Sequence, residues 1–124
     1  MDVGPEKRPF FRTNDDPRYQ WQRLTVVHTL IAMDIDFEWD EHKRQVNLRK
    51  HGVDFADAVE VFYDDLACVM EDPDHHDEQR FVVIGIDAFQ RVLVVVYTQP
   101  DEQTIRIISA RAATAAERRH YQQG

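Results

Sequence analysis

The hydrophobic pattern of the chain becomes regular at residues 34–40, DIDFEWD, where three apolar side chains alternate with acidic ones. This alternation is typical of a β-strand with one buried face. Residues 41–51 lose the alternation, and their composition predicts a helix. Asp40 is a suitable N-cap for this helix, and Gly52 stands where a left-handed residue would end it.

The next part of the chain combines a second helix with a series of strands. Asp54 can cap the helix, whose apolar residues recur at spacings of three and four, namely Phe55, Ala58, Val59 and Phe62. Strands are predicted by the apolar runs at residues 66–72, 80–87, 91–98 and 104–110. Thr114 and Glu117 form a capping box, which predicts a short closing helix.

The order of these elements predicts an α+β fold: an antiparallel β-sheet with the two N-terminal helices packed on one face and a short C-terminal helix. The preceding residues show no sustained period until about Gln22, and three of the first 17 are prolines. We therefore divide the chain into an irregular N-terminal extension, residues 1–33, and one folded domain, residues 34–124. We expect one of two origins for this extension: either the protein starts at Met33, or the residues before it form an additional N-terminal arm.

Composition narrows the class of protein. The chain has 124 residues, which allows one domain with a modest core. Its longest apolar run, residues 92–97, is far shorter than the roughly 20 residues of a membrane-spanning helix. Cys68 is the only cysteine, which excludes an internal disulfide, and no signal-peptide pattern opens the chain. These features predict a cytoplasmic protein without a membrane segment.

The formal net charge of −8 makes any cluster of cationic residues informative, because proteins that bind nucleic acid usually present a basic face. In the helix of residues 41–51, Lys43, Asn47 and Lys50 recur at helical spacing and share one face, and His51 adjoins it. This face is a candidate for RNA contact. The alternative is an ordinary solvated stripe on the helix surface.

The last predicted strand contains two arginines, and simple alternation places Arg106 and Arg111 on opposite faces. An arginine at the end of an apolar strand face must meet a carboxylate, a backbone carbonyl or a phosphate. For Arg111 the sequence leaves open a phosphate contact or a salt bridge to Glu78 or Glu117. The same two alternatives, phosphate or carboxylate, hold for Arg80.

The closing helix collects acid, base and cation chemistry in one short segment, with Glu117, Arg118, Arg119, His120 and Tyr121. These residue types suit metal-free RNA cleavage, which needs a proton acceptor, a proton donor and positive charge near the phosphate. Helix C-termini also favour Arg and His because of the backbone dipole alone. The composition of the helix therefore permits a catalytic role without requiring one.

Two adjacent histidines, His75 and His76, lie among five acidic residues in EDPDHHDE, residues 71–78. Such groups can hold a divalent metal, but adjacent histidines in a turn lack the spacing that brings two ligands to one side of a helix. We expect a solvated loop here, and neither a metal nor another cofactor.

Three segments together resemble the BrnT family of bacterial type II toxins: FEWDEHKRQVNLRKHGVDFADAVEVF, DEQRFVVIGI and RIISARAATAAERRHY. The resemblance covers residues 34–121. It implies a fold similar to the RelE ribonuclease toxins and a metal-independent endoribonuclease that inhibits translation. It also implies a BrnA-type antitoxin as partner, with a ribbon-helix-helix part that makes the DNA contacts.

The residue types and the resemblance together suggest roles for individual residues. Phosphate binding or transition-state stabilisation is expected for Arg80, Arg106 and Arg111, and proton transfer for His51, Glu78, His120 and Tyr121. RNA binding is expected for Lys43, Asn47 and Lys50. An alternative, favoured by the acidic charge and by Gln99 and Pro100 where a cation is expected, is a non-catalytic module that acts with the antitoxin as a transcriptional co-repressor.

Overall fold

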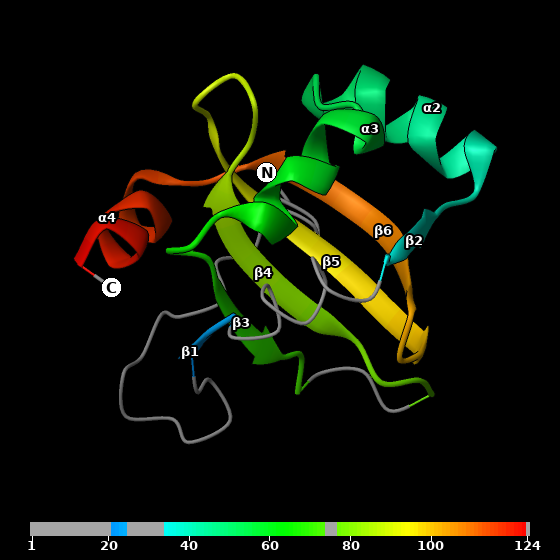
Figure 1. Ribbon diagram of the computed structural model, residues 1–124. Coiled ribbons are helices and arrows are strands. Elements are labelled where there is room, and N and C mark those ends of the chain that lie inside the picture. The colour runs from blue at the N-terminus through cyan, green and yellow to red at the C-terminus, as the bar shows by residue number, and fades with distance from the viewer. Residues whose placement is uncertain (1–20, 25–33, 74–76, 124) are drawn as a thin grey trace.

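The computed structural model describes residues 21–24, 34–73 and 77–123 (Figure 1). Its strands are β1 (Gln22–Arg23), β2 (Asp36–Glu38), β3 (Cys68–Glu71), β4 (Phe81–Ile86), β5 (Val92–Asp101) and β6 (Thr104–Ala112). Its helices are α2 (Glu41–His51), α3 (Phe55–Ala58), the 3-10 helix η2 (Val59–Tyr63) and α4 (Ala115–Gln123). No helix among these residues is long and apolar enough to cross a membrane.

The six strands form one sheet in the order β1-β3-β4-β5-β6-β2. The predicted α+β class is confirmed, but the prediction of a purely antiparallel sheet is wrong. β2 pairs with β6 in parallel, whereas the other neighbours are antiparallel. The parallel pair arises because the chain passes through α2, α3 and three further strands before β6 returns beside β2, so no hairpin sets its direction.

The first predicted helix is confirmed, including both of its ends. The side chain of Asp40 accepts a hydrogen bond from the backbone N–H of Lys43, and Gly52 has the left-handed conformation that ends the helix. The second predicted helix changes character: α3 ends at Ala58 and continues as the 3-10 helix η2. η2 lies so close to the sheet that a Cβ at Gly85 would sit 2.8 Å from Cγ1 of Val61.

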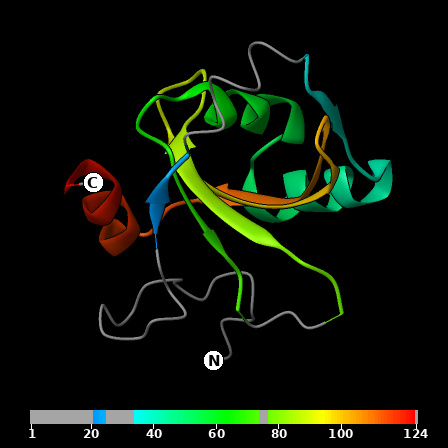
Figure 2. The same cartoon turned by 60° about the horizontal axis from the view of Figure 1, so that its bottom comes forward.

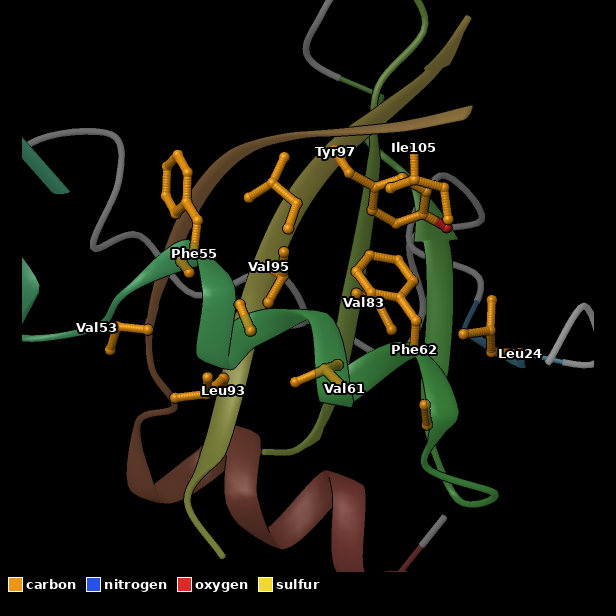
Figure 3. Close-up of a cluster of buried hydrophobic side chains, with 14 residues drawn as sticks. Leu24, Val53, Phe55, Val61, Phe62, Val83, Leu93, Val95, Tyr97 and Ile105 are labelled. Carbon is orange, nitrogen blue, oxygen red and sulfur yellow. The ribbon is translucent and has the colours of Figure 1, made fainter. Parts of the chain in front are cut away.

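The two faces of the sheet carry separate hydrophobic clusters. On one face, residues of α3 and η2 pack against β4 and β5, and Figure 3 shows Phe62 beside Val83 and Tyr97. The rings of Phe62 and Tyr97 meet edge to face with their centroids 4.9 Å apart. On the opposite face, Tyr121 of α4 belongs to a cluster with Val82.

The helices occupy different parts of the sheet. α4 packs on the sheet face opposite to α3 and η2. Alternate residues of each strand form the two faces, because neighbouring strand residues point to opposite sides. α2 lies beside β6, far from α4 (Figures 1 and 2). The only fully buried residue of α2 is the polar Asn47, so this helix adds no apolar side chain to the buried core.

Part of the predicted N-terminal extension joins the fold. β1 pairs with β3 at the edge of the sheet, and Leu24 is buried in the larger hydrophobic cluster. The rest of the extension, residues 1–20 and 25–33, lies outside the described residues, as do His75 and His76.

A β-bulge in β6 reverses one prediction about its side chains. Val96 of β5 is opposite Ser109, but the next residue, Tyr97, is opposite Ile107, so Ile108 is an extra residue in β6. A one-residue insertion shifts all following side chains to the other face. Arg106 and Arg111 therefore lie on the same face of the sheet, whereas simple alternation had placed them on opposite faces.

Candidate active site

Four polar side chains form a row across adjacent strands on the face that also carries α4. Arg106 of β6 is paired with Thr98 of β5 on one side and with Glu38 of β2 on the other. The register of β4 and β5, continued by one residue, places Arg80 opposite Thr98. We refer to Arg80, Thr98, Arg106 and Glu38 as the polar row.

Carboxylates flank both arginines of the polar row. Nε of Arg106 donates a hydrogen bond of 2.8 Å to Oε2 of Glu38, and both side chains are exposed, at 56% and 43%. Nε of Arg80 donates to Oε1 of Glu78 at 2.9 Å. Beside the row is a cavity of about 420 Å³, lined by Glu38, Glu78, Gln79, Thr98, Gln99, Pro100 and Arg106.

A second cavity, of about 380 Å³, lies between α2 and the edge of β6. Its lining is rich in basic groups and consists of His42, Lys43, Val46, Asn47, Lys50, His51, Ile108 and Ser109. We call it the α2 groove. Ser109 connects it to the polar row, because Ser109 and Arg106 lie three residues apart on the same face of β6.

Asn47 holds α2 against the sheet. Its side-chain amide donates to the backbone carbonyl of Ala110 at 2.7 Å, and its Oδ1 accepts from the backbone N–H of Ala110 at 3.1 Å. It also donates to the carbonyl of Val53 at 3.0 Å. The pairing of β2 with β6 ends at Arg106. Further along this edge of β6, the side-chain amide of Asn47 takes the place of a strand and bonds the backbone groups of Ala110. Asn47, for which the sequence suggests RNA binding, thus makes a structural contact from the lining of the α2 groove.

We expect Asn47→Ala to lower the free energy of unfolding by about 2–3 kcal/mol, because it leaves the buried polar backbone groups of Ala110 without their partner. Gln45→Ala is the matched control, since it removes an exposed amide from the same helix and should change stability by less than about 0.5 kcal/mol. Urea denaturation measures both. Equal stability of the two variants would contradict the role of Asn47.

Arg111 and Glu117 form a buried, bidentate ion pair. The two contacts, from Nη1 and Nη2 to the carboxylate oxygens, measure 2.8 and 2.9 Å, and Glu117 is fully buried. The predicted capping box is confirmed as well, with Thr114 and Glu117 exchanging hydrogen bonds. Burial alone would raise the pKa of Glu117, but Arg111 and Thr114 hold it below its ordinary value. Of the two carboxylates named as partners for Arg111, the structure pairs it with Glu117.

The two other candidates from the closing helix also make structural contacts. The hydroxyl of Tyr121 donates to Oδ2 of Asp64 at 2.5 Å, and burial together with this contact raises the pKa of Tyr121. The ring of His120 lies 5.6 Å from that of Trp21, and burial lowers the pKa of His120. Neither residue lines the α2 groove or the cavity beside the polar row.

The structure thus divides the predicted site residues into three groups. Arg80, Glu78 and Arg106 lie at the polar row; Lys43, Asn47, Lys50 and His51 lie at the α2 groove; and Arg111, His120 and Tyr121 lie where α4 meets the sheet. Glu38 and Thr98 were not predicted from the sequence as site residues. The alternation of DIDFEWD did place Glu38 on the strand face away from the apolar side chains. Only the pairing of β2 with β6, however, brings Glu38 next to Arg106.

This arrangement has a definite chemical capacity. Two guanidinium groups can neutralise the oxygens of a phosphate, and the adjacent carboxylates can accept and return protons. Among the described residues, no group of three or more His, Cys, Asp or Glu side chains is placed to hold a metal ion. The fold and site therefore define a small α+β protein equipped to bind a phosphate ester in an open cavity.

Comparison with known proteins places the chain within this class. Residues 39–117 match a family model described as the ribonuclease toxin BrnT of type II toxin–antitoxin systems. The chain belongs to this BrnT family of ribonuclease toxins, for which an antitoxin partner is implied.

A solved structure supports the assignment. The crystal structure of the Brucella abortus ribonuclease toxin BrnT, at 1.1 Å resolution, is similar with a TM-score of 0.51 and 32% sequence identity. The similarity covers 64% of this chain and 97% of that chain. A comparison with curated protein sequences gave no match.

Proposed function

We propose that this ribonuclease toxin cleaves RNA at the polar row by a metal-independent reaction, and that this cleavage inhibits translation. The observation that carries the proposal is Arg106, an exposed guanidinium held between strands at an open cavity with two carboxylates. Proton transfer and charge stabilisation are the two contributions that phosphodiester cleavage by a neighbouring hydroxyl requires, and the cavity offers groups for both.

In the proposed reaction, the ribose 2′-hydroxyl attacks the adjacent phosphorus, the bond to the 5′-oxygen breaks, and a 2′,3′-cyclic phosphate forms. Arg106 stabilises the added negative charge on the non-bridging oxygens, and Arg80, which holds Glu78 beside the cavity, adds positive charge next to it. Glu78, whose side chain is 47% exposed, accepts the proton of the 2′-hydroxyl. The proton needed by the leaving 5′-oxygen comes from water or from the same carboxyl group once it is protonated.

The α2 groove extends this site along the RNA. Lys43 and Lys50 are exposed cations on its lining, and His51 adjoins them. Because Ser109 lies on the same face of β6 as Arg106, an RNA strand can pass from the polar row into the α2 groove without crossing the sheet. We assign Lys43, Lys50 and His51 to binding the phosphates next to the cleaved bond. This basic track would offset the negative charge of the rest of the chain.

We expect Lys43→Ala to weaken RNA binding by about threefold to tenfold and to reduce the salt dependence of binding by the contribution of one phosphate contact. Arg49→Ala is the control, because it removes the same charge from the same helix but Arg49 does not line the α2 groove. Binding of a catalytically inactive variant to single-stranded RNA at several salt concentrations measures both effects. Equal losses for the two variants would show that only net charge matters.

The proposal gives Arg111, His120 and Tyr121 supporting roles. Arg111 and Tyr121 attach α4 to the sheet through Glu117 and Asp64, and His120 packs on Trp21. These contacts support the sheet face that carries the polar row without placing the three side chains at its cavity. The expected catalytic roles of these residues are therefore reassigned to positioning.

The implied antitoxin is, in this proposal, a BrnA-type protein with a ribbon-helix-helix part encoded beside this gene, and it supplies all contacts to DNA. The acidic chain itself, with a formal net charge of −8, is poorly suited to bind DNA. Since the substrate is cellular RNA, the proposed location is the cytoplasm. Co-expression of the two neighbouring genes should give a complex that co-purifies. Separate elution of two soluble products would count against this partner.

A second candidate function remains a non-catalytic module that acts with the antitoxin as a co-repressor. It is favoured by the cavity beside the polar row, where Gln99 and Pro100 take positions at which a further cation would help RNA cleavage. Induced expression in a bacterium without the antitoxin distinguishes the two. Growth arrest with fragmented RNA is expected of the ribonuclease, whereas normal growth with intact RNA and soluble protein would indicate the module.

A further inference from the structure

We propose that Glu38 is a positioning residue of the ribonuclease site, which orients the guanidinium of Arg106 toward the RNA phosphate. This inference rests on the proposed function of the polar row. It arises from the parallel pairing of β2 with β6, which places the two residues side by side although they are 68 positions apart in the sequence.

The contact between the two side chains leaves the reactive end of Arg106 available. Glu38 accepts the hydrogen bond from Nε, at 2.8 Å, and no other hydrogen bond of the Arg106 side chain is found among the described residues. The two terminal nitrogens, Nη1 and Nη2, are the donors that bind a phosphate in a bidentate manner. A carboxylate held at Nε thus fixes the plane of the guanidinium without competing with the substrate.

The two sequence neighbours of Glu38 hold strand β2 in place. Phe37 points to the opposite side of the sheet, where its ring lies 5.3 Å from that of Phe62. The ring of Trp39 packs edge to face on Phe55 at 6.1 Å. These aromatic contacts hold the backbone of the short strand β2, from which the side chain of Glu38 reaches the long side chain of Arg106.

The ion pair of Glu38 and Arg106 contributes little to the stability of the fold. We therefore look for its role in the reaction. Both side chains are largely exposed, and exposed ion pairs typically contribute only about 0–1 kcal/mol. Holding an arginine in a productive orientation, by contrast, affects the rate steeply, because small displacements of a catalytic group lower it by factors of about ten to one hundred.

Three variants of the full chain test the inference with an RNA cleavage assay. Glu38→Ala should lower kcat about tenfold or more and leave KM within about twofold. Glu38→Gln should keep kcat within about threefold of the unmodified protein, because its amide oxygen can still accept the hydrogen bond from Nε. Adding Glu38→Ala to Arg106→Ala should cause no further loss, since Glu38 acts only through Arg106.

Asp36→Ala is the matched control. Asp36 is an exposed carboxylate on the same strand and face, two residues from Glu38, and its loss should leave kcat unchanged. Melting temperatures of all variants should agree with that of the unmodified protein, which excludes loss of folding as the cause.

Several results would overturn the inference. If Glu38→Gln is as impaired as Glu38→Ala, the carboxylate itself is required and Glu38 transfers a proton. If Glu38→Ala is fully active, or if its effect adds to that of Arg106→Ala, Glu38 does not act through Arg106. If Arg106→Ala alone retains full activity, the proposed site fails together with this inference, which separates that failure from the others.

Discussion

Replacing Arg106 by alanine should lower the rate of RNA cleavage by about 100-fold to 1,000-fold, the loss typical of removing one donor that stabilises developing negative charge. The free energy of unfolding should change by less than about 1 kcal/mol, because the ion pair of Arg106 with Glu38 is exposed. Steady-state cleavage of a defined RNA, together with urea denaturation of the same preparation, measures the two quantities side by side.

Arg119→Ala is the control for this prediction. Arg119 is an exposed arginine of α4 and lines neither the α2 groove nor the cavity beside the polar row. Its removal changes the net charge by the same amount and should leave the cleavage rate within about twofold, since a distant exposed charge makes a small contribution. Full activity of Arg106→Ala would remove the polar row from consideration as the catalytic site.

Arg111→Ala should have the opposite profile, with a large effect on stability. Removing one partner of a buried ion pair leaves an unpaired charge and typically costs about 3–5 kcal/mol. For a chain of this size, the melting temperature should fall by roughly 10–20 °C. The double variant Arg111→Met, Glu117→Leu should recover much of this loss, because it removes both charges from the buried site and fills the space with apolar groups.

The acid stability of the protein provides a second readout of the same pair. The pKa of Glu117 is lower in the folded protein than in the unfolded chain, so its contribution to stability is fully present above the pKa of the unfolded chain. The contribution is lost as the pH falls through the folded pKa. Arg111→Ala should therefore weaken this acid-dependent part of the stability.

A stable Arg111→Ala protein that cleaves no RNA would instead show that Arg111 contacts the substrate.

The elements that could be predicted from the sequence are those determined by local contacts. The N-cap at Asp40, the left-handed Gly52 and the capping box of Thr114 and Glu117 depend only on residues within one helical turn. The strands of the meander were found because each apolar run is bounded by turn-forming residues. The helical spacing of Lys43 and Lys50 likewise sufficed to place them on one face, which the α2 groove confirms.

The features that escaped prediction depend on distant contacts or on a backbone irregularity. The pairing of β2 with β6 joins residues 68 positions apart, and nothing in either segment specifies its parallel direction. The bulge at Ile108 had one visible signal, since the adjacent Ile107 and Ile108 break the alternation of apolar and polar residues. Simple alternation across this pair placed Arg106 and Arg111 on opposite faces of the strand. The sequence therefore predicted which residues belong to the candidate site, but not how they are arranged.

The sequence also could not separate catalytic candidates from structural ones. Arg106 and Arg111 are the same residue type on the same strand, but one is exposed at a cavity and the other is buried against Glu117. The difference depends on where α4 packs, because this helix covers one end of the sheet face and leaves the other open. That position follows from tertiary packing, which the composition of the closing helix does not reveal.

Metal-independent RNA cleavage by attack of the 2′-hydroxyl can be measured by following a short RNA and its cleavage products in the presence of EDTA. We expect cleavage to persist in EDTA, the products to carry 2′,3′-cyclic phosphate and 5′-hydroxyl ends, and a single 2′-deoxy nucleotide at the cleaved position to prevent the cut. Loss of cleavage in EDTA, or equal cutting of the 2′-deoxy substrate, would contradict this mechanism.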